Sequence, residues 1–242
     1  MTDWPRFPKA PIAEAILDVS VVLPPSSDLQ RIRSLQEALG GQYPKVTERM
    51  PFHGGFEITS AGVTVSTSSG RPDGYLFTSS DDLQTIQARL DGFGFSRMKP
   101  YEHWSAFRAE AKRQWEKYRD LLQPKSITRI GLRYLNRLEL PLPVNDLRKY
   151  VRNTPELAPD LPQVLTGFFM AVQLPVDASF AVITETIEPA TPAILPFILD
   201  IAVHREGQFD SDSMWDVFDE LRELKNRIFF HSVTDHAKEM FR

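Results

Sequence analysis

Residues 126–141 have the sequence SITRIGLRYLNRLELP, in which apolar side chains alternate with basic ones. Successive side chains of a strand point to opposite faces of its sheet, so this alternation predicts a strand with one apolar and one basic face. The apolar set consists of Ile130, Leu132, Tyr134, Leu138 and Leu140. Asn136 falls on the same face, and because a buried amide needs partners, we expect it to form a structural hydrogen bond where the two halves of the protein join.

Further strands and helices are expected on both sides of this strand in the sequence. Alternating apolar residues predict a strand over residues 11–24, and short segments separated by turn sequences predict an antiparallel meander over 52–95. Aromatic and aliphatic residues spaced three and four apart predict long amphipathic helices over 101–122 and 211–230. The segment LPQVLTGFFMAVQL, residues 161–174, also has an amphipathic pattern, so we expect a helix there, followed by two strands.

The order of these elements indicates that one structural unit occurs twice. Three pairs of similar short sequences occur in the same order in the two halves, namely Val21-x-Leu23-Pro24 with Leu138-x-Leu140-Pro141, Leu90-Asp91 with Leu199-Asp200, and Trp104-x-x-Phe107 with Trp215-x-x-Phe218. We therefore predict a duplicated β-α-β(3–4)-α unit, with an N-terminal repeat over 1–124 and a C-terminal repeat over 125–242, packed as one globular unit.

This arrangement predicts an α+β fold in which a continuous curved antiparallel sheet carries helices on one face. In plan, it is similar to TATA-binding-protein-like and helix-grip folds. A fold of this kind does not by itself indicate a function. It does predict a geometry, because the apolar strand faces must meet the helices and the other face of the sheet then stays open.

Seven charged or polar residues are expected together on that open face. Counting alternate residues along three strands places there Arg89, Asp91, Arg129, Arg133, Arg137, Asp200 and His204. They form either cross-strand ion pairs on a solvated sheet, worth about a few tenths of a kcal/mol each, or a polar cradle in which arginines bind a carboxylate or phosphate. Gly131, between two of the arginines, would let a ligand approach the backbone closely.

Basic residues are concentrated in the middle of the chain. The whole sequence of 242 residues has a formal net charge of −4, whereas residues 97–152 contain 14 basic and 6 acidic side chains. Either acidic neighbours in the fold neutralise this segment, or it forms a surface that faces an anion. Nucleic-acid binding by residues 97–152 is therefore an alternative function, although the acidic remainder of the chain argues against nonspecific binding.

The sequence lacks the motifs of common catalytic and metal sites. It contains no cysteine, no HExxH pair of histidines, no Walker A sequence and no G-x-S-x-G motif. We therefore predict no metal and no cofactor, and we assign no catalytic residue. The enzymatic alternative is a hydrolase or ligand-processing enzyme that uses Asp200 with His204, or Asp91 with Asp200, as an acid–base pair. No signal peptide or apolar span is evident, so we expect a cytoplasmic protein without a membrane partner.

Several stretches resemble a known protein family. They are PKAPIAEAILDV, YLFTSSDDLQTIQARLDGFGFSR, PYEHWSAF, RIGLRYLNRLELP, FILDIAVHRE and LKNRIFFHSVTDHAKEMF. Over nearly its whole length, the chain resembles a sporadically distributed bacterial family of uncharacterised proteins. The resemblance implies a scattered, horizontally transferred bacterial gene of the kind found near defence, immunity or toxin–antitoxin operons. It implies no catalytic residue.

The leading hypothesis is a non-enzymatic binding module that recognises a partner protein or a small anionic ligand on the open face. Arg129, Arg133 and Arg137 would anchor the partner or ligand. Asp91, Asp200 and His204 would orient these arginines. A homodimer is compatible with this hypothesis.

Overall fold

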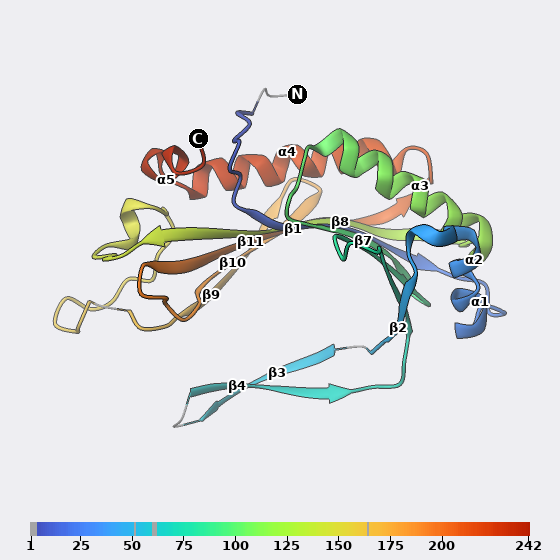
Figure 1. Ribbon diagram of the computed structural model, residues 1–242, viewed down its shortest axis with the longest axis horizontal. Helices are drawn as coiled ribbons and strands as arrows, with labels where there is room; N and C mark the ends of the chain where they lie inside the picture. The colour runs from blue at the N-terminus through green and yellow to red at the C-terminus, as the bar shows by residue number, and fades with distance from the viewer. Residues whose placement is uncertain (1–3, 51, 60–61, 164) are drawn as a thin grey trace.

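A nine-stranded antiparallel sheet forms the centre of the computed structural model (Figure 1). The structure describes residues 4–50, 52–59, 62–163 and 165–242. Within these residues, the strands of the sheet lie in the order β2-β5-β6-β7-β1-β8-β11-β10-β9. Their bounds are β1 (Ile12–Val22), β2 (Lys45–Arg49), β5 (Gly74–Thr78), β6 (Gln84–Arg89), β7 (Gly92–Met98), β8 (Ser126–Pro141), β9 (Phe169–Val176), β10 (Ser179–Ile187) and β11 (Ile194–Phe209).

Two long helices lie along one face of this sheet, and shorter elements complete the fold (Figure 1). The long helices are α3 (Trp104–Leu122) and α4 (Met214–Ser232). The short elements are α1 (Leu29–Arg33), α2 (Leu35–Leu39), α5 (Asp235–Glu239) and the 3-10 turns η1 (Gly40–Gln42) and η2 (Leu147–Lys149). Strands β3 (Phe52–Thr59) and β4 (Gly62–Ser69) pair with each other as a separate two-stranded sheet. The predicted α+β class is therefore confirmed.

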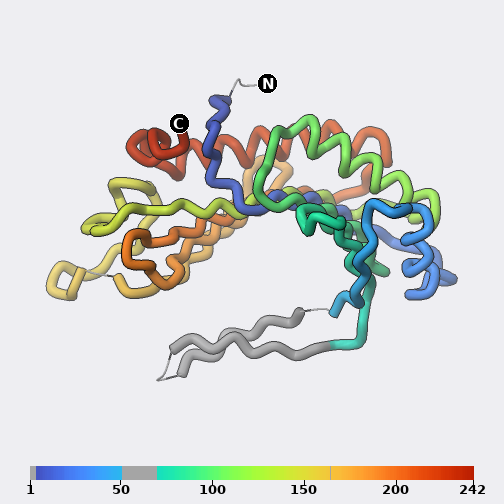
Figure 2. The backbone as a smooth tube through the Cα atoms, in the orientation of Figure 1, coloured from blue at the N-terminus to red at the C-terminus, as the bar shows by residue number. Residues whose placement is uncertain are grey.

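Strands β1 and β8 lie side by side at the middle of the sheet. Leu17 is opposite Leu132 in their antiparallel register, and Asp18 is opposite Gly131. Strands β7, β6, β5 and β2 extend outward from β1, and β11, β10 and β9 extend outward from β8 (Figure 2). The continuous antiparallel sheet that the sequence predicts is thus present, and its central pair joins the beginning of the chain to its middle.

The core lies between the sheet and the two long helices. The aromatic stripe of α3 faces the sheet, where the ring of Phe93 on β7 lies 5.7 Å from Trp115 and 5.5 Å from Tyr118. Helix α4 buries Trp215, Phe218 and Leu221 in the same layer. Helix α3 begins three residues later than the pattern predicts, because the His103 side chain accepts a hydrogen bond from the Ala106 backbone and so caps the helix.

Strand β8 has the two faces that its sequence predicts. All five members of its apolar set are buried against the helices, whereas the side chains of Arg133 and Arg137 remain partly in solvent. The predicted hydrogen bonding of Asn136 is confirmed, since its side-chain amide donates to the carbonyl oxygens of Leu199, at 3.0 Å, and Tyr134, at 3.2 Å. Tyr134 lies on β8 and Leu199 on β11, so these bonds lie within the second half of the chain and not, as predicted, where the two halves join.

The helix expected over residues 161–174 is wrong. Residues Phe169–Val176 form β9, which pairs along its length with β10 at the edge of the sheet. Gly167 and Pro175 disfavour a helix here, and an edge strand tolerates a proline because its outer hydrogen-bonding row is free. Among the described residues, no helix is both long enough and apolar enough to cross a membrane.

Candidate binding site on the open sheet face

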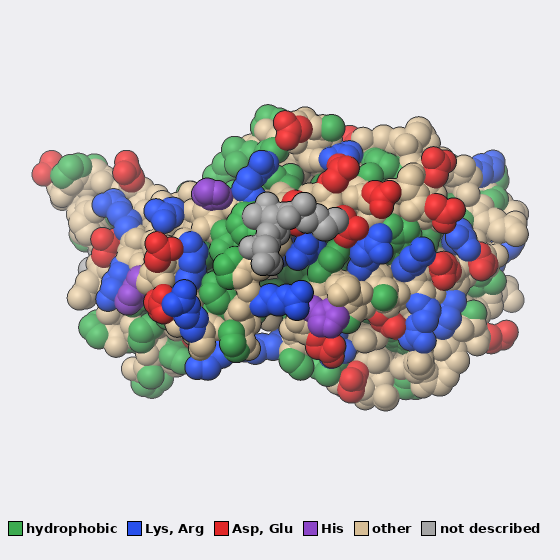
Figure 3. Space-filling view, turned by 90° about the horizontal axis from the view of Figure 1, so that it is seen from above, with side chains coloured by type: hydrophobic (Ala, Val, Ile, Leu, Met, Phe, Trp, Pro, Cys, Tyr) green, Lys and Arg blue, Asp and Glu red, His purple; other side chains and the backbone are tan. Residues whose placement is uncertain are grey.

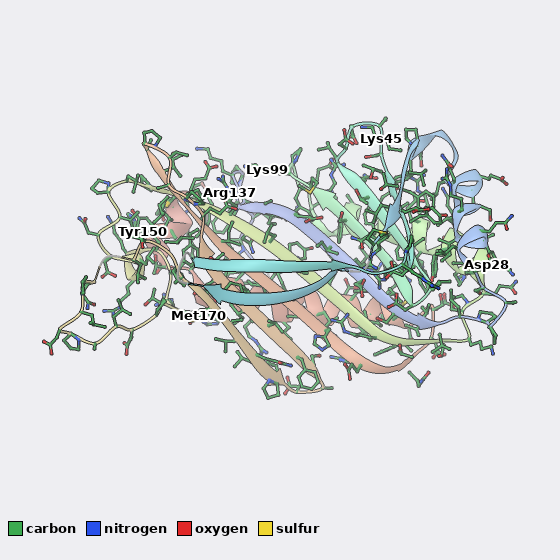
Figure 4. The ribbon with its side chains drawn as sticks, turned by 90° about the horizontal axis from the view of Figure 1, so that it is seen from below. Asp28, Lys45, Lys99, Arg137, Tyr150 and Met170 are labelled. Carbon is green, nitrogen blue, oxygen red and sulfur yellow. The ribbon has the colours of Figure 1, made fainter. Side chains whose placement is uncertain are left out.

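The open face is the side of the sheet opposite α3 and α4, and Arg129, Arg133 and Arg137 of β8 mark its centre. Figure 4 views this side, with the long helices behind the strands and Arg137 labelled. Six of the seven predicted residues lie within strands on this face, namely Arg89, Arg129, Arg133, Arg137, Asp200 and His204. Asp91 lies instead in the turn between β6 and β7, where 80% of its side chain is exposed. Asp91 is therefore an exposed turn residue, whereas Asp200 is a nearly buried residue within β11.

Asp18 links two arginines that come from strands on either side of β1. Its carboxylate lies 2.7 Å from Nη1 of Arg89 and 3.3 Å from Nη1 of Arg129. Arg89 also donates through Nε to Asp91 at 2.9 Å. Although burial opposes the charge of Arg89, Asp18 and Asp91 raise the pKa of this guanidinium above its ordinary value. The sequence prediction missed Asp18, but its position between the buried Leu17 and Val19 indicates the open face by simple alternation.

Arg133 and Asp200 form the shortest ion pair among the predicted residues. Nε of Arg133 lies 2.9 Å from each carboxylate oxygen of Asp200, and Nη2 of Arg133 lies 2.6 Å from Oδ2. This hydrogen bonding with Asp200 raises the pKa of Arg133, against the effect of partial burial. The two side chains differ in exposure, with 53% of Arg133 in solvent and 10% of Asp200. Asp200 therefore fixes the orientation of an arginine that the solvent can still reach.

Arg137 also has carboxylate partners, at 2.8 Å from Glu139 and 3.1 Å from Glu188. Each of the four predicted arginines is thus paired with at least one carboxylate. The space beside Gly131 is bordered by protein side chains, since a Cβ atom there would be in ordinary contact with Nη1 of Arg129, at 3.4 Å, and with Cβ of His204, at 3.5 Å. The glycine accommodates protein side chains in this structure.

His204 packs against an aromatic neighbour and forms no acid–base pair with Asp200. Its ring stacks on Phe180 of β10, with the ring centres 5.4 Å apart. Burial, together with the nearby charge of Arg129, lowers the pKa of His204 below its ordinary value. Asp200 lies four residues earlier on β11 and gives its carboxylate to Arg133. The structure therefore does not bring these two side chains into hydrogen-bonding contact.

The basic segment 97–152 is divided between the two sides of the sheet. Its arginines on α3 pair with acidic side chains, as Arg108 does with Asp219 of α4 and Arg113 with Glu110. Figure 3 shows the helix side, where acidic and basic side chains are interspersed. Acidic neighbours thus neutralise much of this segment, and the described residues form no group of three potential metal-binding His, Asp or Glu side chains.

The chain matches no protein-family model, and a search of curated proteins finds no similar one.

Proposed function

We propose that the chain is a non-enzymatic binding module whose open face recognises a partner protein. The observation that carries this proposal is the Arg133–Asp200 pair, in which a nearly buried carboxylate holds a half-exposed guanidinium. Asp200 accepts hydrogen bonds from the Nε and Nη2 edge of the guanidinium. Nη1 and the outer hydrogen of Nη2 therefore remain as donors for a partner. Interfaces are enriched in arginines, and one with a fixed orientation loses little entropy on binding.

A partner protein fits this face better than a small anion does. Every predicted arginine already has a carboxylate partner, so a free anion must either bind the remaining donors beside that carboxylate, which repels it, or displace the carboxylate. Displacing Asp200 would leave a nearly buried charge unpaired, which costs about 3–5 kcal/mol when a buried pair is broken. A protein surface with both acidic and basic groups can instead dock onto the pairs without breaking them.

Apolar side chains lie among these ion pairs. Ile16 of β1 and Leu135 of β8 are half-buried on the open face, and Phe180 of β10 exposes 37% of its surface. Aromatic and aliphatic groups next to fixed arginines are typical of protein interfaces. Recognition would therefore combine apolar contact with charge complementarity along β1, β8, β11 and β10.

We further infer that the sheet descends from a duplicated unit, with repeats over 1–124 and 125–242. The strand order supports this, because β7 and β11, each preceding a long helix, lie next to β1 and β8, the first strand of each repeat. The split falls between α3 and β8. The same proposal includes a resemblance to TATA-binding-protein-like or helix-grip folds. It also includes a cytoplasmic location and a bacterial defence context.

Comparative affinity capture tests the proposed partner site. The immobilised wild type, an Arg133→Ala/Asp200→Ala variant and a control Arg119→Ala/Asp120→Ala variant are exposed to the same cell extract. The double substitutions remove both charges of a pair, so neither leaves a buried carboxylate alone. The control pair lies on α3, on the other side of the sheet, where Arg119 is partly exposed and Asp120 is exposed.

We expect the wild type and the control to retain a common protein that the Arg133/Asp200 variant loses. That protein is then purified and its affinity for each variant measured by titration, with an expected loss of about tenfold or more. Equal affinity for all three variants would overturn the proposal. Saturable perturbation of the Arg133 Nε NMR signal by inorganic phosphate or citrate alone would instead support a small anionic ligand and contradict a partner-protein site.

A further inference from the structure

A cavity of about 350 Å³ lies on the helix side of the sheet, away from the open face. The N-terminal segment, the residues that begin α3, and α4 surround it, and Asn136 of β8 contributes to its lining. Its aromatic lining consists of Trp4, Phe7, Tyr101, Trp104, Phe229 and Phe230. The cavity has the size of the smaller binding sites for organic molecules, and its walls combine aromatic rings with polar groups.

The walls of this cavity are held in place by specific contacts. Trp4 stacks on Phe230 of α4 with the ring centres 4.8 Å apart, and its indole donates a hydrogen bond to Glu223 at 3.0 Å. Trp104 at the start of α3 donates to Asp219 of α4 at 2.6 Å. The N-terminal segment and α3 are thus both tied to α4, so the cavity is preformed.

Lys225 of α4 lines this cavity without a charged partner. Only 8% of the residue is exposed, and Nζ lies 3.8 Å from the centre of the Tyr134 ring. Within the described part of the chain, Nζ has no hydrogen-bond acceptor and no carboxylate within 4 Å. The nearest acidic neighbour on the same helix, Glu223, pairs with Arg222.

Burying an ammonium group without a charged partner costs free energy, because the group loses its hydration. The surroundings of Lys225 shift its pKa accordingly. Burial and the charge of Arg222 lower the pKa of Lys225 to about 7, whereas the face of the Tyr134 ring favours the protonated form. A bound anion would supply the charge that the ammonium lacks. Two asparagines, Asn136 and Asn226, line the same space and add neutral hydrogen-bonding groups.

We propose that this cavity binds a small carboxylic acid with an aromatic or branched apolar body, whose carboxylate pairs with Lys225. Three other charged residues line the cavity: Arg6 is exposed to solvent, Arg222 is already paired with Glu223, and Glu102 would repel a second negative charge on the ligand. Phosphate esters therefore fit less well than monocarboxylates. The aromatic walls would enclose the apolar body of the ligand.

The probes for this proposal are phenylacetate and 4-methylpentanoate, each compared with its neutral amide and with inorganic phosphate. The indole N–H signals in NMR spectra report binding, because Trp4 and Trp104 line the cavity while Trp115 and Trp215 are buried elsewhere. We expect at least one acid to shift the Trp4 and Trp104 signals saturably. Its amide should bind about tenfold more weakly or worse, since a charge-assisted hydrogen bond is lost.

Two variants complete the test. Lys225→Met keeps the apolar stem and removes the charge, and it should weaken binding of the acid about tenfold or more. Lys125→Met removes an exposed lysine and should leave binding unchanged. The proposal is overturned if neither acid shifts the signals, or if the amide or phosphate binds as tightly as the acids. It is also overturned if Lys225→Met binds the acid as tightly as the wild type does. The acid–amide comparison uses the wild type alone, so it remains decisive even if Lys225→Met fails to fold.

Discussion

The guanidinium of Arg89 occupies the space into which a side chain of Gly92, the first residue of β7, would project. A side chain at position 92 would overlap this guanidinium and the carbonyl oxygen of Val19. Because β7 lies between β6 and β1, Arg89 reaches Asp18 across this glycine. The DGFGF sequence, residues 91–95, thus combines two buried phenylalanines on the helix side with glycines that leave room for an ion pair on the open face.

Gly92→Ala should destabilise the protein by about 1–3 kcal/mol, because the added methyl group must displace backbone as well as a buried side chain. Gly94→Ala is the matched control. A Cβ atom at position 94 would meet its nearest neighbours at 3.4–3.6 Å, which is ordinary contact, so we expect a change within about 0.5 kcal/mol. Urea unfolding of both variants measures this difference, and equal free energies of unfolding would refute the close approach at Gly92.

Asp18→Asn should cost more stability than Asp91→Asn, although both carboxylates contact Arg89. Asp18 bridges two arginines and is largely shielded, so its removal leaves the buried Arg89 with one exposed partner and should cost about 2 kcal/mol or more. Asp91 is mostly in solvent, so its loss should cost about 0.5 kcal/mol. Free energies of unfolding at neutral pH provide the comparison. A larger cost for Asp91→Asn would show that Asp18 is not the main partner of Arg89.

The pair of Arg133 and Asp200 should show strong coupling in a double-mutant cycle. Arg133→Ala alone leaves a nearly buried carboxylate unpaired, whereas the double alanine variant removes both charges. We therefore expect the double variant to lose about 1–2 kcal/mol less than the two single variants together. Urea unfolding of the four proteins gives this coupling free energy. Additive losses would mean that Asp200 does not hold Arg133 in solution.

Alternation along strands predicted much of the fold and of the open face. In β8, the period of two places Leu132 and Arg133 on opposite faces whatever the neighbouring strands are, and the structure has them so. The same counting along β1 would have placed Asp18 on the same face of the sheet as Arg129. A pattern within one strand does not show which side chains meet, however, because that depends on register with other strands.

Other features depended on contacts that a single segment does not specify. Residues Phe169–Val176 become β9 because they pair with β10, and this pairing outweighs the amphipathic pattern that predicted a helix. Lys225 stands on the apolar stripe of α4 between Leu221 and Phe229, which is a detectable signal for an unusual buried lysine. Its cavity needs the N-terminal segment and the start of α3, which lie far from α4 in the sequence.

Glu185 should make the stability of the protein depend on pH. This residue of β10 is fully buried, accepts one hydrogen bond from Asn153 at 3.3 Å, and has no partner for Oε2 among the described residues. Burial raises the pKa of Glu185 from 4.5 to about 7, and the hydrogen bond from Asn153 only partly opposes this. The folded protein therefore holds a proton on Glu185 that the unfolded chain releases at lower pH.

Because the folded state binds more protons in this range, the free energy of unfolding should fall as the pH rises from about 4.5 to about 7. Glu185→Gln removes the titrating group, so this variant should exceed the wild type in stability by about 1–3 kcal/mol at pH ~8 and resemble it near pH ~4.5. Glu206→Gln, which alters an exposed glutamate of β11, serves as the control and should follow the wild type. Urea unfolding at several pH values tests this, and a Glu185→Gln curve parallel to that of the wild type would contradict a protonated buried carboxyl.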